Sequence, residues 1–297
     1  MTTNLCQVSD TTTHSAICKY CGSNNVVKYG KKGRVQYYLC RSCGHTFAGN
    51  NALPGMRFSA EQIAASINMF YEGLSIDAIR RHLESLYNIC PSDSTVYAWI
   101  VRFTEVAAKE VKISNVKVGD FWIVGETVLN INEGKDVWLW DIIDDKTRFL
   151  LASLMPSSRT MQNARQLMSR AVKAAGHPPK ILNLDKRKAH LDGIEIVFGD
   201  DTSHPQQEGF MVEPNMNMIE RFHGTLEART KVIRRMKKNE TAKLIMEGWL
   251  VHYNFFRPHH ELKNKTPGEV AQATFPYKSW QELIIGSNPR NAICVSI

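Results

Sequence analysis

Beyond Gly119 the chain carries apolar runs that predict strands. Three runs rich in aromatic and β-branched residues are separated by short polar turns: FWIVGETVLNI (121–131), DVWLWDII (136–143) and TRFLLASLM (147–155). Runs of this length and composition, joined by short turns, predict an antiparallel meander of three strands.

A helix and a further strand follow this meander. Ala164, Leu167, Met168 and Ala171 recur at helical spacing, and KILNLD (180–185) has the composition of another strand. The resulting order of strand, strand, strand, helix, strand predicts a layered α/β domain.

Helical spacing also occupies residues 59–103. Gly73 ends a first helix, Ser75 is placed to cap a second, and a third begins near Ser92 or Ser94. Three short helices with a glycine-containing turn predict a helix-turn-helix module, although small three-helix units without a DNA-binding function are common.

Four of the seven cysteines form two Cys-x2-Cys pairs separated by eighteen residues: Cys18, Cys21, Cys40 and Cys43. Two such pairs can direct four thiolates at one ion, and the intervening KYGKKGRVQYYL has the pattern of a hairpin. We therefore expect a zinc ribbon with a structural Zn2+ ion. Disulfides are disfavoured because the first residues have no export signal. The isolated Cys6, Cys90 and Cys294 receive no role.

The net charge and its distribution along the chain point to a class of partner. The net charge is +8, and no acidic residue stands between Asp10 and Glu61, where seven lysines and arginines lie. This distribution favours a polyanion, and hence double-stranded DNA, as the partner. A second basic run at 229–238 fits a DNA contact and a solvated helix face equally well.

The overall composition is that of an ordinary globular protein, with 43% apolar and 22% charged residues. No apolar run approaches the roughly 18 residues that span a bilayer, so we expect no membrane segment and a cytoplasmic, nucleoid-associated protein. The expected domains are a ribbon with a flexible N-terminus (1–56), a helix-turn-helix module (57–115), a catalytic core (116–275) and a tail (276–297).

Several motifs together carry a family resemblance. They are Glu126-Thr127, Asp185-Lys186, NMIERFH (217–223), YNFFRPH (253–259) and Thr266-Pro267, with 34 residues between Asp185 and Glu220. With them, nearly the whole chain resembles the DDE-type transposases of bacterial and archaeal insertion sequences. The resemblance implies an RNase H-like core with a mixed five-stranded sheet flanked by helices, following an N-terminal zinc ribbon or helix-turn-helix module.

The resemblance also explains why Gly125 is unusual. Such enzymes cleave and join DNA with two Mg2+ or Mn2+ ions about 4 Å apart, held by carboxylates from separate elements. By resemblance Asp185 and Glu220 are catalytic residues and metal ligands, whereas Gly125 occupies the place of the first aspartate, which bridges both ions in the family. We expect metal binding to be weakened and strand transfer to be lost or severely reduced.

Nearby acids do not convincingly replace the missing one. Glu126 should point to the opposite face of the strand, and Asp120 lies too far along it. Asp144 ends the second strand, where a turn residue is the simpler interpretation, and Glu227 lies two helical turns beyond Glu220.

Contacts with DNA are expected at three places. The candidates are Lys28, Lys31, Lys32 and Arg34 in the ribbon, Ser94, Thr95 and Tyr97 on the third helix, and Arg229, Lys231, Arg234 and Arg235 in the second basic run.

Other polar residues keep two interpretations. His223 either orients Glu220 or touches phosphate, or it is a histidine satisfied on its helix face, and Arg257 and His259 either close the core or contact DNA. His204 and Gln206 are further candidates for contacts with DNA ends.

The first hypothesis is a transposase by descent that recognises terminal inverted repeats, inserts into target DNA as a homodimer or larger assembly, and has lost most of its catalytic activity. The alternative is a non-catalytic, transposase-derived regulator. A decayed or deliberately inactivated copy is a third possibility.

Overall fold

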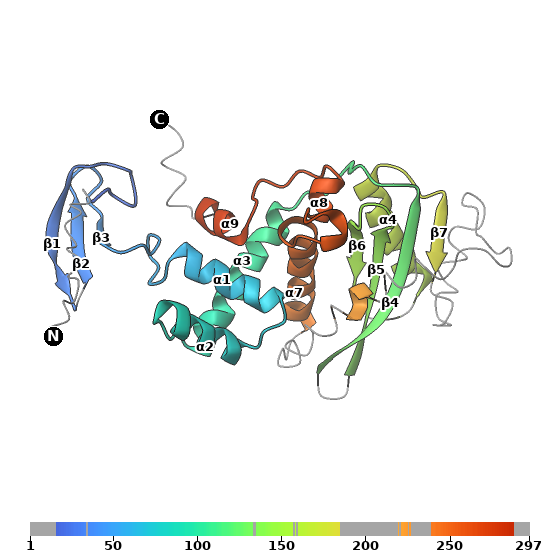
Figure 1. Cartoon of the computed structure of the whole chain (residues 1–297), viewed down its shortest axis with the longest axis horizontal. Coiled ribbons are helices and arrows are strands. Elements are labelled where there is room, and N and C mark those ends of the chain that lie inside the picture. Colours follow the sequence, from blue (N-terminus) through green and yellow to red (C-terminus); the bar gives the residue numbers. More distant parts are fainter. Residues whose placement is uncertain are drawn as a thin grey trace, which may run out of the picture. The chain divides into compact units, whose positions relative to one another are not determined.

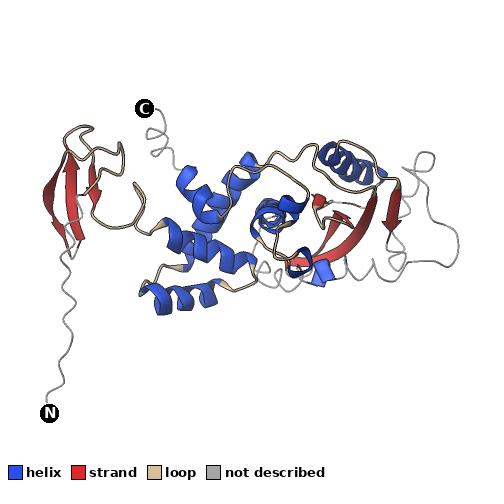
Figure 2. Cartoon of the chain, turned by 45° about the horizontal axis from the view of Figure 1, so that its top comes forward, coloured by secondary structure: helices blue, strands red, loops and turns tan. Residues whose placement is uncertain are grey.

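The computed structural model describes residues 16–33, 35–132, 135–156, 158, 160–184, 219, 221–224, 226 and 239–287 (Figure 1). The chain forms two compact units, one from Met1 to Ala60 together with the segment from Ile285, and one from Glu61 to Ile284. Strands make up the first unit, whereas the second combines helices with a sheet (Figure 2). None of the helices in the described ranges combines the length and apolar character needed to cross a bilayer.

The first unit is a three-stranded antiparallel sheet in the order β1-β2-β3. Its strands are β1 (Val26–Lys32), β2 (Val35–Cys40) and β3 (Thr46–Ala48). The hairpin predicted between the two cysteine pairs is thus observed, while β3 has no counterpart in the prediction. The buried cluster of Cys18, Cys40 and Phe47 is small, so little apolar surface holds this unit together.

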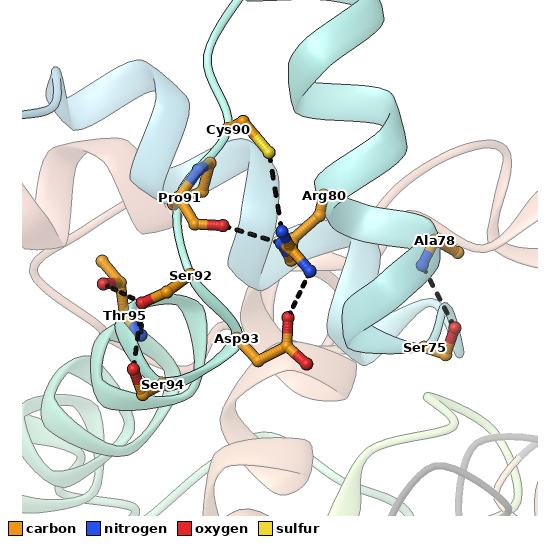
Figure 3. A network of polar contacts seen from close by, with 9 residues as sticks. All are labelled: Ser75, Ala78, Arg80, Cys90, Pro91, Ser92, Asp93, Ser94 and Thr95. Atoms are coloured by element: carbon orange, nitrogen blue, oxygen red, sulfur yellow. Dashed lines mark hydrogen bonds and ion pairs between the residues drawn. The ribbon is translucent and has the colours of Figure 1, made fainter.

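The second unit begins with α1 (Ala60–Tyr71), α2 (Ile76–Tyr87) and α3 (Asp93–Glu110). The predicted cap is present: the Ser75 hydroxyl accepts a hydrogen bond from the Ala78 amide (Figure 3). Of the two serines near which the third helix was expected to begin, Ser92 is the cap, and its hydroxyl accepts a hydrogen bond from the Thr95 amide. These bonds satisfy amide groups that have no partner within the first helical turn.

The core sheet has the order β6-β5-β4-β7. It consists of β4 (Phe121–Asn132), β5 (Lys135–Asp144), β6 (Leu150–Leu154) and β7 (Ile181–Leu184). β4, β5 and β6 form the predicted antiparallel meander, and β7 pairs parallel to β4, so the sheet is mixed. The fifth expected strand lies outside the described residues.

Helices complete the second unit. α4 (Met161–Ala175) lies between β6 and β7 in the sequence, and α7 (Asn239–Val251) packs against α3 and continues into η1 (His252–Phe256) (Figure 1). The chain then forms η2 (His260–Leu262), α8 (Pro267–Val270) and α9 (Trp280–Gly286).

A buried polar cluster joins the N-terminal helices to the C-terminal ones. The Trp280 indole N–H donates to His252 Nδ1 at 3.2 Å, which leaves the hydrogen on His252 Nε2, 3.2 Å from the Glu72 carboxylate. Tyr71 stacks on both rings. The three helices therefore pack with the core in one unit, and the domain boundary near residue 115 stays a prediction.

Candidate functional site

Gly125 faces Asp141 across the β4–β5 hairpin, and Glu126 faces Trp140. Side chains at directly paired positions share one face of a sheet, and consecutive positions point to opposite faces. Residue 125 and Asp141 therefore share a face, while Glu126 is buried on the other, with 1% of its surface exposed. The expectation that Glu126 cannot replace an acid at position 125 agrees with this register.

Two side chains occupy the space beside Gly125. A Cβ atom added to this glycine would lie 2.5 Å from His223 Cε1 and would also collide with the side chain of Ile219. Carbon atoms normally approach to about 3.5–4.0 Å. Ile219 and His223, one helical turn apart, thus fill the place where a side chain of residue 125 would begin.

Asp141 is a buried carboxylate that the sequence-based reasoning missed. It is fully buried, and it accepts hydrogen bonds from His223 Nε2 at 3.2 Å and from the Ser153 hydroxyl. One sequence signal points to it: an aspartate interrupts an otherwise apolar strand run. The turn alone would pair Gly125 with Ile142, and a register shift between Asn130 and Asn132 brings Asp141 opposite Gly125 instead.

Asp144 and Asp120 have other partners. Asp144 is fully buried and accepts hydrogen bonds from the amides of Gly119 and Thr147 and from the Thr147 hydroxyl, so it is a turn residue. Asp120 is half exposed and pairs with Lys180 at 2.7 Å; this hydrogen bond holds the pKa of Asp120 below its usual range.

The proposed acids of the family motif lie outside the described residues. This holds for Asp185, Glu220 and Glu227, and also for His204 and Gln206. The described part of β7 ends at Leu184, which pairs with Val124, the residue before Gly125. The β4 residue beside this pair is Gly125, which has no side chain. In the described part of the chain, position 125 therefore offers no carboxylate to a two-metal centre.

The tail motif closes the core. The Asn254 side chain is fully buried and bonds both the amide and the carbonyl of Leu150, each at 2.9 Å, so it completes the backbone hydrogen bonding of β6. Arg257 lies 3.5 Å from Glu72. Burial, together with Arg257, lowers the pKa of His259 to about 4. The described contacts of these residues are internal.

The four cysteines form a separate candidate metal centre. Their sulfur atoms all lie within 4.8 Å of one another, and the Cys18–Cys43 and Cys21–Cys40 pairs are 3.6 Å apart. A tetrahedral zinc site with Zn–S bonds of 2.3 Å would separate its sulfurs by about 3.8 Å. The thiol set and its spacing therefore fit a structural Zn2+ ion.

The basic candidates of the ribbon are only partly described. Lys28, Lys31 and Lys32 are exposed on β1, and Tyr29 beside them is 65% exposed. The remaining basic candidates lie outside the described residues: Arg34, Arg229, Lys231, Arg234 and Arg235.

The N-terminus of α3 is held by local polar contacts (Figure 3). Arg80 of α2 donates to the Pro91 carbonyl at 2.7 Å and pairs with Asp93 at 2.6 Å, so it fixes the turn between the helices. Ser94 is exposed there, whereas Thr95 and Tyr97 are half-buried.

Residues 119–259 match the family described as DDE domain. The segment 119–259, just under half of the chain, is a DDE domain. The matched segment begins just before β4, carries Gly125 and Asp141, and ends in the tail motif. No curated protein matches the sequence.

Retroviral proteins are among the solved structures to which this chain is similar. The magnesium-bound catalytic core of HTLV-2 integrase covers 52% of this chain and 97% of its own length at 13% identity and a TM-score of 0.40. The BIV integrase core covers 52% and 94% at 16% identity and a TM-score of 0.37. A simian T-cell lymphotropic virus intasome in complex with PP2A regulatory subunit B56 gamma matches 72% of this chain and 77% of its own chain, at 13% identity and a TM-score of 0.42.

Among the described residues, the Gly125 face of the sheet and the cysteine cluster are two places where side chains suited to metal binding or hydrogen bonding converge. One presents a complete ligand set. The other presents a glycine enclosed by Ile219 and His223.

Proposed function

We propose that this protein is a transposase-type protein that binds the ends of its DNA element and whose strand-transfer activity is lost or severely impaired. The observation that carries the proposal is at position 125, the place of the family's first acid by resemblance. It is a glycine, and its side-chain space is taken by Ile219 and His223.

The chemistry explains why this position matters. Two divalent cations repel each other, and a bridging carboxylate reduces that repulsion while fixing both ions around the reacting phosphate. Asp185 and Glu220 are the proposed remaining ligands for Mg2+ or Mn2+. Without an acid at position 125 they would hold the ions weakly.

DNA binding is proposed for the N-terminal part. Zn2+ held by the four cysteines would organise the β1–β2 hairpin, whose exposed Lys28, Lys31 and Lys32 suit contacts with phosphate. We further propose that α1, α2 and α3 act as a helix-turn-helix module with Ser94 near the base edges. By family, the protein would act as a homodimer or larger assembly on paired terminal inverted repeats, at the nucleoid in the cytoplasm.

The test is Mn2+-dependent strand transfer with DNA that carries the element's ends. The native chain should give no more product than an Asp185→Ala variant. Robust native activity that disappears in Asp185→Ala would show that position 125 does not need an acid.

A second candidate function is a non-catalytic regulator of transposition or transcription. It is favoured by the contrast between a complete cysteine set and a core without its first acid. Footprinting with zinc-loaded protein tests this candidate: protection of terminal repeats or of a promoter at moderate salt supports it. Failure to bind any duplex tightly contradicts both functions.

A further inference from the structure

Three paired positions form a row across the sheet. Ser153 on β6 pairs with Asp141 on β5, and Asp141 pairs with Gly125 on β4. Because directly paired residues share a face, all three positions point to the same side. The row therefore places the Asp141 carboxylate beside the glycine, on the face where the family's first acid is expected.

The protein itself supplies hydrogen-bond partners to both oxygens of the Asp141 carboxylate. A buried carboxylate is costly unless it has donors or a positive partner. His223 Nε2 lies 3.2 Å from one carboxylate oxygen, with only 8% of the histidine side chain exposed, and the Ser153 hydroxyl donates to the other oxygen. The carboxylate thus has its partners without any metal ion.

The bond to His223 depends on the glycine. The same imidazole that reaches Asp141 leaves 2.5 Å between its Cε1 atom and a Cβ atom built on Gly125. A contact this short is not tolerated between carbon atoms, so any larger residue must displace the ring or the strand. Ile219, one turn earlier, closes the same space.

We propose that Asp141 and His223 are a positioning pair that fixes the helical residues 221–224 against the sheet and takes the place of the metal-bridging contact. Gly125 is then part of a repacked site, and Gly125→Asp alone will not restore strand transfer. The inference rests on the proposed function in taking position 125 as the place of the first acid, but stability measurements test it separately.

The first test is a double-mutant cycle on the zinc-loaded full chain, followed by thermal unfolding. Gly125→Asp should lower the melting temperature by roughly 3–8 °C. Adding His223→Ala to it should cost much less than His223→Ala costs in the native background, because this second change removes the ring with which the new side chain clashes. Additive losses would overturn the proposal.

A matched control separates the clash from the loss of a glycine. Gly224 follows His223 in the same helical segment, and a Cβ atom added there meets nothing within 4 Å. Gly125→Ala should lower the melting temperature, whereas Gly224→Ala should not. Equal effects of the two variants would contradict the packing argument.

A second cycle tests the pair itself. Asp141→Asn and His223→Ala should each destabilise the chain, and the double variant should lose little more than the worse single variant. Independent losses would contradict the pairing.

Strand transfer distinguishes this inference from the proposed function. Strand transfer by the native chain refutes the proposed function. The contact between Asp141, His223 and Gly125 is then tested by the two double-mutant cycles alone. Activity restored by Gly125→Asp alone refutes the inference while the native chain's inactivity still stands.

Discussion

The cysteine cluster and the Gly125 face of the core sheet bring polar side chains together in opposite ways. Four sulfurs lie within 4.8 Å of one another in a small buried cluster, whereas Asp141 accepts hydrogen bonds from His223 and Ser153 within a large core. The first arrangement needs a cation to hold it, and the second is already satisfied. The comparison teaches that a set of thiols is satisfied by binding an ion, whereas a buried carboxylate can be satisfied by donors within the protein.

The largest effect is expected when the zinc site is removed, which tests whether the cysteine cluster depends on a metal ion. Cys40→Ser should abolish stoichiometric zinc binding and unfold the ribbon, because structural zinc supplies about 10–16 kcal/mol in comparable small units. The thermal transition of the second unit should stay unchanged. Zinc analysis and NMR spectra check this.

Cys90→Ser is the control for that experiment, because Cys90 is exposed and lies outside the cluster. It should retain one zinc ion per chain. If Cys40→Ser instead kept the hairpin folded without metal, the contrast between the two regions would fail.

A smaller effect is expected from a buried carboxylate of the core. Asp144→Ala leaves the amides of Gly119 and Thr147 without their acceptor and should lower the free energy of unfolding by about 3 kcal/mol. Asp120→Ala, whose carboxylate is half exposed, should change it little. Denaturant titrations of the two variants measure this difference. Equal losses in the free energy of unfolding would argue against a stabilising role for the buried hydrogen bonds of Asp144.

The smallest expected effect is a pH dependence of the core. The pKa of His259 is lowered from 6.5 to about 4, mainly by burial, so the unfolded chain binds this proton more readily than the folded one. Stability is therefore full above pH 6.5 and is lost as the pH falls from there through about 4. Because His259 is partly exposed to solvent, the expected loss in the free energy of unfolding is on the order of 1–2 kcal/mol.

His259→Gln should remove this part of the acid sensitivity. Melting temperatures measured across the same pH range check it. An unchanged pH profile in the variant would mean that other groups cause the acid loss.

Much of the fold follows from local patterns. The four described core strands, α4, the cap at Ser75 and a helix start near Ser92 or Ser94 were all expected, because strand composition, helical spacing and capping residues act over a few neighbours. The third ribbon strand was missed, since Thr46–Ala48 is too short to show a pattern. The helix-turn-helix and zinc ribbon functions stay predictions.

The candidate site was less predictable. The significance of Gly125 and the turn role of Asp144 could be anticipated from motif and position. Asp141 could not be recognised so easily, because its partner His223 lies 82 residues away and only the folded sheet brings the two together. The room that Gly125 leaves for that contact is likewise a property of tertiary packing.

The proposed function requires that this core does not support the two-metal reaction of DDE transposases. The most direct measurement is single-turnover strand transfer in Mn2+ with end-containing DNA, comparing zinc-loaded native chain with Asp185→Ala. The account predicts the same background level of product from both. Product from the native chain alone would contradict it.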